Sequence, residues 1–109
     1  MDQAVLIIFP LSDSKFGTSE ERDVLGQLGE DLAATIEDAG IGEFDGNDIG
    51  EGVYTFYLYA NDADELLEAV EPLLYFVDWP TQITAVKRYG PPGAKEVKVV
   101  IEVDDEGQE

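Results

Sequence analysis

The stretch VYTFYLYA, residues 53–60, carries apolar or aromatic side chains on both faces of the β-strand that its composition predicts. Successive side chains of a strand point to opposite faces, which puts Tyr54, Phe56 and Leu58 on one side. The other side carries Val53, Thr55, Tyr57 and Tyr59. Because Tyr is enriched at protein interfaces, we expect these four residues to contact a partner or a second copy of the chain.

A second stretch, AVLIIF at residues 4–9, is apolar throughout. A continuous apolar run of this length is typical of a strand that is buried on both faces. The two stretches therefore predict the central strands of one sheet.

A helix of about 20 residues is predicted after the first strand. Thr18 and Glu21 have the spacing of a capping box, apolar residues then recur at helical spacing, and Gly40 suits the helix end. Residues 41–45 predict a short strand. Residues 46–52 (GNDIGEG) predict a turn-rich loop.

A second helix is predicted after residues 53–60. Asn61 or Asp62 is a suitable N-cap, and apolar residues follow at helical spacing. Pro72 predicts a kink or a new start just before it, because proline lacks the backbone donor that a helix interior needs. The pair Trp79-Pro80 predicts the helix end.

The C-terminal part predicts a hairpin of two strands, residues 83–89 and 96–103. Pro92 and Gly93 suit the central positions of a type II turn between them. The last residues, 104–109, contain four acids and no apolar residue, so they predict a disordered tail.

The order strand, helix, strand, strand, helix, strand, strand predicts an α+β fold, a ferredoxin-like split β-α-β sandwich with an extra C-terminal hairpin strand. Two helices would cover one face of an antiparallel sheet, and residues 1–103 would form a single domain. The other face would stay uncovered although its central strands are apolar. We therefore expect a homodimer that forms through this open sheet face.

Acidic residues dominate the composition, with 25 Asp and Glu against 6 Lys and Arg and a net charge of -19. Such a charge repels nucleic acid and anionic membranes and attracts basic proteins. Besides a second copy of the chain, we therefore expect a basic protein as a partner, and neither nucleic acid nor a membrane. The chain has no Cys and no His, which excludes disulfides, Cys-His and Ser-His catalysis and the usual zinc ligands. The apolar run near the start is far shorter than the roughly 20 residues of a membrane helix, so we expect a cytoplasmic protein. We also expect no cofactor.

Two segments resemble ligand loops only in part. Residues 45–51 begin like a calcium loop, but Ile49 and Phe56 stand where that loop needs oxygen ligands, so a solvated loop is favoured over a metal site. Residues 12–19 lead into a helix N-terminus whose amides can hold an anion, but the neighbouring acids favour simple capping. We assign no catalytic residue and no metal ligand, because among 25 carboxylates chance spacing explains any acid–base pair.

Four of the six basic residues lie on the C-terminal hairpin: Lys87, Arg88, Lys95 and Lys98. Lysine on an edge strand protects it from aggregation, which is the simpler interpretation of this cluster. A small anion site, or self-association by charge complementarity, is the functional alternative.

Three motifs resemble those of a family of small bacterial proteins without an assigned activity. They are FGT at residues 16–18, GEFDG at residues 42–46 and RYGPPG at residues 88–93. The resemblance covers most of the chain and implies a standalone domain. It implies no catalytic residue, because the glycines and prolines of these motifs belong to turns.

Several classes of function remain open. The leading hypothesis is a non-catalytic interaction protein, such as an inhibitor, an immunity protein or a regulatory subunit, that binds a basic partner. The alternative is a homodimer that binds or senses a small ligand at the open sheet face. A small enzyme that uses Glu, Tyr or Lys there is a third hypothesis. The acidity could also be an adaptation to a salt-rich cytoplasm.

Overall fold

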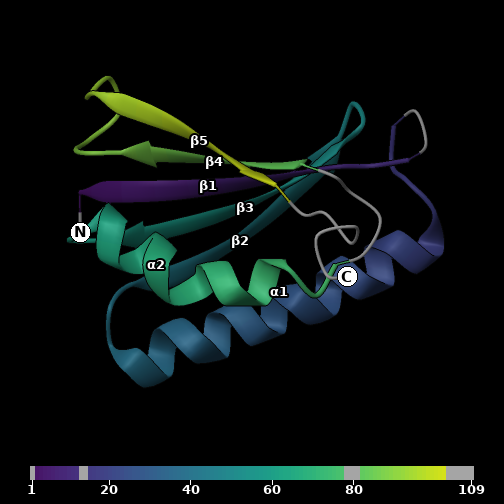
Figure 1. Cartoon of the computed structure of the whole chain (residues 1–109), viewed down its shortest axis with the longest axis horizontal. Coiled ribbons are helices and arrows are strands. Elements are labelled where there is room, and N and C mark those ends of the chain that lie inside the picture. Colours follow the sequence, from purple (N-terminus) through teal and green to yellow (C-terminus); the bar gives the residue numbers. More distant parts are fainter. Residues whose placement is uncertain (1, 13–14, 78–81, 103–109) are drawn as a thin grey trace.

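The computed structural model describes residues 2–12, 15–77 and 82–102. Its elements are β1 (Gln3–Pro10), α1 (Ser19–Ala39), β2 (Glu43–Gly50), β3 (Val53–Ala60), α2 (Ala63–Leu74), β4 (Gln82–Arg88) and β5 (Glu96–Glu102). The five strands form one antiparallel sheet in the order β2-β3-β1-β4-β5. Both helices pack against the same face of that sheet, below it in Figure 1. The predicted α+β class, with two helices on one face of an antiparallel sheet, is confirmed.

The core lies between the helices and one face of the sheet. Phe56 of β3 is fully buried there and contacts three other rings, with centroid distances of 5.9 Å to Phe9, 6.1 Å to Phe44 and 5.1 Å to Tyr54. Alternate residues of β1 and β3 supply most of the sheet's share of this core. The alternation follows from the two-residue period of a strand.

The predicted capping box at the start of α1 is confirmed. The Glu21 backbone amide donates to the Thr18 hydroxyl at 3.1 Å, and the Thr18 amide donates to the Glu21 carboxylate at 3.2 Å. Gly40 ends the helix in the left-handed region, with φ 65°, as its predicted role requires.

The loop predicted over residues 46–52 is wrong, because β2 extends through most of it. The strand runs over Glu43–Gly50, and a register shift between Phe44 and Asn47 absorbs the irregular stretch. The turn to β3 contains only Glu51 and Gly52, with φ 53° and 84°. Edge strands tolerate polar residues and bulges. Residues that usually form turns can therefore belong to a strand here.

The predicted end of α2 is also wrong. The helix ends at Leu74, before the pair Trp79-Pro80, which lies outside the described residues. Pro72 lies inside the helix, so it starts no new one. The physical reason for the early end is that proline removes a backbone hydrogen bond and leaves the last turn weak. Asp62 is the N-cap, one of the two residues predicted.

The turn between β4 and β5 has the predicted geometry. The Ala94 amide donates to the Pro91 carbonyl at 2.9 Å, which places Pro92 and Gly93 at the turn centre, and Gly93 has φ 98°. These are the features of a type II turn. The predicted tail at residues 104–109 lies outside the described residues.

Candidate interaction surfaces

The side of the sheet that faces away from the helices, called the open face below, is apolar at its centre. Tyr57 of β3, Leu6 of β1 and Val86 of β4 are paired across the strands and form one cross-strand row. Thr55, Ile8, Thr84 and Val100 form the next row. The described residues of both rows are at least partly accessible, and Val100 is 49% exposed.

The four residues predicted as an interface lie together on this open face. Val53, Thr55, Tyr57 and Tyr59 occupy alternate positions of β3, between the buried positions of the same strand. Their neighbours Leu6, Ile8, Val86 and Val100 were not predicted as part of this interface. The apolar pattern of β1 was visible in the sequence, but strand order and register were needed to bring these residues to the same face.

The two edges of the open face carry different charges. On β2, Glu43 is paired with Tyr59 and Asp48 with Thr55, so both carboxylates belong to the open face. On the far side, Arg88 of β4 is paired with Glu96 of β5, Lys98 is paired with Val86, and Glu102 is paired with Gln82. The open face is therefore acidic along β2 and mixed, with two cations and two acids, along β4 and β5.

One end of the open face is hollowed. Pockets for small molecules measure about 300–1,000 Å³. This one lies at the small end, with about 330 Å³ between Ile8, Pro10, Val53, Gln82 and Thr84. Among the described residues, its lining has hydrogen-bonding groups on Gln82 and Thr84 and no charged side chain. It could therefore hold a small, mostly apolar and neutral molecule.

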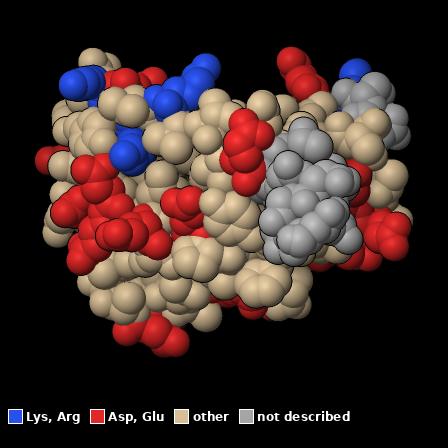
Figure 2. All heavy atoms as spheres, viewed as in Figure 1, with Lys and Arg blue, Asp and Glu red and all other residues tan. Residues whose placement is uncertain are grey.

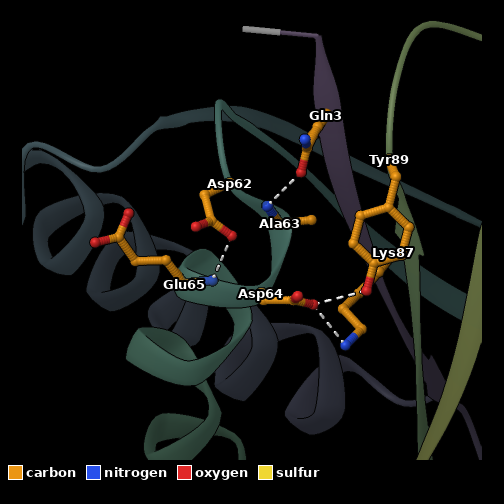
Figure 3. A network of polar contacts seen from close by, with 7 residues as sticks. All are labelled: Gln3, Asp62, Ala63, Asp64, Glu65, Lys87 and Tyr89. Atoms are coloured by element: carbon orange, nitrogen blue, oxygen red, sulfur yellow. Dashed lines mark hydrogen bonds and ion pairs between the residues drawn. The ribbon is translucent and has the colours of Figure 1, made fainter.

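The four cations of the predicted anion site do not share one face. Lys87 points to the helix side, where its Nζ donates to Asp64 Oδ1 at 2.8 Å (Figure 3). Arg88 and Lys98 belong to the open face, and the Arg88 Nε donates to the Gly90 carbonyl at 2.7 Å. Lys95 is exposed beside the hairpin turn. The sheet thus separates Lys87 from Arg88 and Lys98.

A polar network joins the start of α2 to β4. Asp64 Oδ1 accepts hydrogen bonds from Lys87 Nζ and from the Tyr89 hydroxyl, the latter at 2.7 Å (Figure 3). The hydrogen bond from Lys87 lowers the pKa of Asp64, and the bond from Tyr89 adds to the effect. The same contact with Asp64 raises the pKa of Lys87. Lys87 therefore serves the packing of α2 against the sheet.

The N-termini of both helices have partners within the chain. At α1, the Glu21 carboxylate also accepts from the Ser12 amide at 3.3 Å, in addition to its capping bond. At α2, Gln3 Oε1 accepts from the Ala63 amide at 2.8 Å, and Asp62 accepts from the Glu65 amide at 3.1 Å (Figure 3). An internal carboxylate therefore occupies the position that an external anion would take at residues 12–19.

The outer side of the helices forms a second surface, called the acidic helix layer below. Its exposed carboxylates are Glu20, Asp23, Glu30, Asp31, Glu37, Asp38, Asp64, Glu65 and Glu68. The only basic residue in either helix is Arg22, whose guanidinium donates to the carbonyls of Phe16 and Gly17 at 3.0 Å each. Figure 2 shows carboxylates over the helix side, with most of the visible Lys and Arg at the opposite edge.

An aromatic hollow interrupts the acidic helix layer at the end of α2. It measures about 340 Å³ and is lined by Glu68, Glu71, Pro72 and Tyr75. The Tyr75 hydroxyl donates to Glu71 Oε2 at 2.8 Å, and this bond raises the pKa of Tyr75. Two carboxylates beside an exposed ring provide both the charge and the π-face that a Lys or Arg side chain binds.

Within residues 2–12, 15–77 and 82–102, no group of three or more acidic side chains is arranged to hold a metal ion, and no helix is long and apolar enough to cross a membrane. The residues that resembled a calcium loop belong instead to β2 and its turn. Comparison of the chain with models of protein families, with curated proteins and with solved structures finds no match. The function therefore has to be inferred from the surfaces themselves.

Proposed function

We propose that this chain is a non-catalytic, cytoplasmic interaction protein that binds a basic protein through its acidic helix layer, as an inhibitor, an immunity protein or a regulatory subunit does. One observation carries the proposal. The carboxylates of this layer have almost no basic neighbours, and several stand where they destabilise the helices. Helix stability therefore does not explain their presence.

The ends of the helices give the clearest example. The C-terminal end is the negative end of the helix dipole, where basic residues stabilise and acidic residues destabilise. Neither helix has a basic residue in its last turn, and α1 carries Glu37 and Asp38 there. In α2, Glu68 stands four residues after Asp64 and three after Glu65, spacings at which like charges repel.

A surface of this kind favours rapid association with a basic partner. Clustered charges of one sign steer an oppositely charged protein toward the surface and raise the association rate, and salt screens the effect. Once the proteins are in contact, the hollow between Glu68, Glu71 and Tyr75 is suited to anchor one Lys or Arg of the partner.

We also propose that the domain is ferredoxin-like. Two arrangements support this: α1 connects β1 and β2, which flank β3, and α2 connects β3 and β4, which flank β1. These are the two interleaved β-α-β units of that fold. β5 then extends the sheet beyond β4 by a hairpin.

The test begins with tagged full-length chain used to capture proteins from lysate at about 50 mM and about 500 mM salt, where the Debye length differs roughly threefold. A captured basic protein is then purified, and its association rate is measured against wild type and the double variant E37K/D38K. The matched control is D45K/E51K on β2 and its turn, which makes the same charge change outside the helix layer. We expect E37K/D38K to slow association more than the control does.

The stability of the same variants provides an independent result. Replacing an acid by Lys in the last turn of a helix stabilises it by about 0.3–1 kcal/mol per site. E37K/D38K should therefore be more stable and bind more slowly, a combination that a misfolded variant cannot produce. Equal association rates for wild type and E37K/D38K, or a rate that salt does not change, would contradict the proposal. A steep rise of stability in molar salt would assign the acidity to the environment instead.

A second candidate function is the binding or sensing of a small ligand at the open face. The hollow of about 330 Å³ beside Val53 and Thr84 is the observation that favours it. V53W would fill this hollow without touching the helix layer. If a metabolite mixture raises the melting temperature of wild type but not of V53W, the ligand hypothesis gains support. No shift with either protein would count against it.

A further inference from the structure

We propose that the open face binds the open face of a second copy of this chain, related by a two-fold axis that runs parallel to the strands above β1. This inference concerns a surface separate from the acidic helix layer, and it holds whether or not a basic partner exists. It rests on the charges at the two edges of the sheet and on the apolar rows between them.

The strand order determines what each two-fold axis brings together. β2 and β5 are the two edges and β1 is the middle strand. An axis parallel to the strands, above β1, places β2 of one copy over β5 of the other. An axis across the strands places each strand over its own copy, so that β2 faces β2. The second arrangement brings Glu43 and Asp48 against the same acids, which costs free energy.

The parallel axis brings a cation, Lys98, next to the acids of β2. It leaves the position along the strand unchanged, so cross-strand rows of one copy face the same rows of the other. Lys98 belongs to the row of Tyr57, which lies between the row of Glu43 and the row of Asp48. Lys98 would therefore meet the acidic edge of β2 in the other copy, twice per dimer. The same axis places Glu96 opposite Glu43, and Arg88, the cross-strand neighbour of Glu96, offsets the charge of that acid pair.

The remaining residues of the face fit the same arrangement. Arg88, beside Glu96 in its own copy, would face Tyr59 of the other, where a guanidinium binds the ring. Leu6 and Ile8 would pack near the axis against their own copies. Apolar residues at the centre with charges at the edge are the usual anatomy of a protein interface.

The size of the face is sufficient for a dimer. Five strands about 4.8 Å apart and seven residues of about 3.3 Å each give roughly 550 Å² per copy. Burying this area on both copies gives roughly 1,100 Å² in total, which exceeds the about 1,000 Å² expected of a biological interface. This places the dimer at the small end of specific complexes.

The experiment uses two charge reversals measured by analytical ultracentrifugation at about 0.15 M salt, where screening limits the general repulsion of two acidic copies. In K98E, two acids would face each other at both contacts. In D48K, two cations would do so. We expect wild type to dimerise and each variant alone to dimerise about tenfold more weakly, since two edge contacts are reversed in each.

Mixing the two variants gives the decisive result. A K98E copy and a D48K copy restore opposite charges at both contacts, so the mixture should form a heterodimer of about wild-type affinity. The controls are K95E and D31K, which make the same changes of net charge at exposed positions outside the open face. They should leave dimerisation within about twofold of wild type, because only the general repulsion changes.

Each other outcome overturns the proposal. A wild-type chain that stays monomeric excludes the dimer. Dimers unaffected by K98E and D48K use another surface. If D48K strengthens the dimer more than D31K does, β2 faces β2 and the axis runs across the strands. Failure of the mixture to associate, with both variants folded by circular dichroism, excludes the pairing of the two edges.

Discussion

The two faces of the sheet are both apolar along the central strands β1 and β3, but their surroundings differ. On the covered face, Phe56 and Leu58 are fully buried beneath the helices. On the open face, the neighbouring Tyr57 and Tyr59 are only partly buried, and no helix covers them. Stability requires the first set, whereas the second set is more apolar than a water-facing surface needs to be. The dimer that we propose rests on this difference.

The largest expected difference is between two adjacent residues of β3. Phe56→Ala removes a ring from the core and should lower the free energy of unfolding by about 3–5 kcal/mol. Tyr57→Ala should lower it by only about 1 kcal/mol in the monomer, mostly through lost strand propensity. Urea unfolding at two protein concentrations checks both, because only a dimer makes stability depend on concentration. Equal losses of unfolding free energy at the two sites, at both protein concentrations, would mean that Tyr57 is as buried in the monomer as Phe56.

A smaller effect is expected where α1 approaches the covered face. A Cβ at Gly29 would lie 3.2 Å from the Phe56 ring, whereas a Cβ at Gly26 would meet nothing within 4 Å. Gly29→Leu should overpack this contact and cost about 1–3 kcal/mol. Gly26→Ala should stabilise by about 0.5–1 kcal/mol through helix propensity. Thermal unfolding of the two variants tests the pair, and stabilisation by both would contradict the close contact at Gly29.

The smallest effect concerns the ion pair between Asp64 and Lys87, at the edge of the covered face. Because the pKa of Asp64 is lowered in the folded protein, its contribution to stability is present above about pH 4 and is lost as pH falls through the folded pKa. Asp64→Asn should remove this part of the acid dependence, and Asp45→Asn on β2 is the charge-matched control. A carboxyl titration followed by NMR measures the pKa directly. A value for Asp64 at or above that of a model peptide would contradict the contact.

Local sequence patterns predicted the elements that depend on local chemistry. The capping box at Thr18, the turn at Pro92 and Gly93 and the strand at residues 53–60 all follow from neighbouring residues, and all are confirmed. The strand predicted at residues 41–45 overlaps only the start of β2. The rest of β2 was missed because its residues favour turns by themselves, and only pairing with β3 holds them in a strand. The end of α2 was predicted too late, because apolar residues continue at helical spacing after Leu74, where the helix ends.

The surfaces were less predictable than the elements. Alternation along β3 correctly separated its two faces. The split of the basic residues between two faces depends on their register in β4 and β5, which no local pattern reveals. The contact of Lys87 with Asp64 joins residues 23 positions apart and required the packing of α2 against β4.

The central position of β1 affects the order in which the molecule is made. Its partners come much later in the chain, since Gln3 pairs with Ala60 and Ala4 pairs with Arg88. At about 5–20 residues per second, roughly 4–17 s separate the synthesis of Ala4 from that of Arg88. Throughout that interval a strongly apolar strand lacks a neighbour on one edge, the condition in which growing chains aggregate. The many carboxylates synthesised in between repel other chains, so the net charge also protects the protein during its own synthesis.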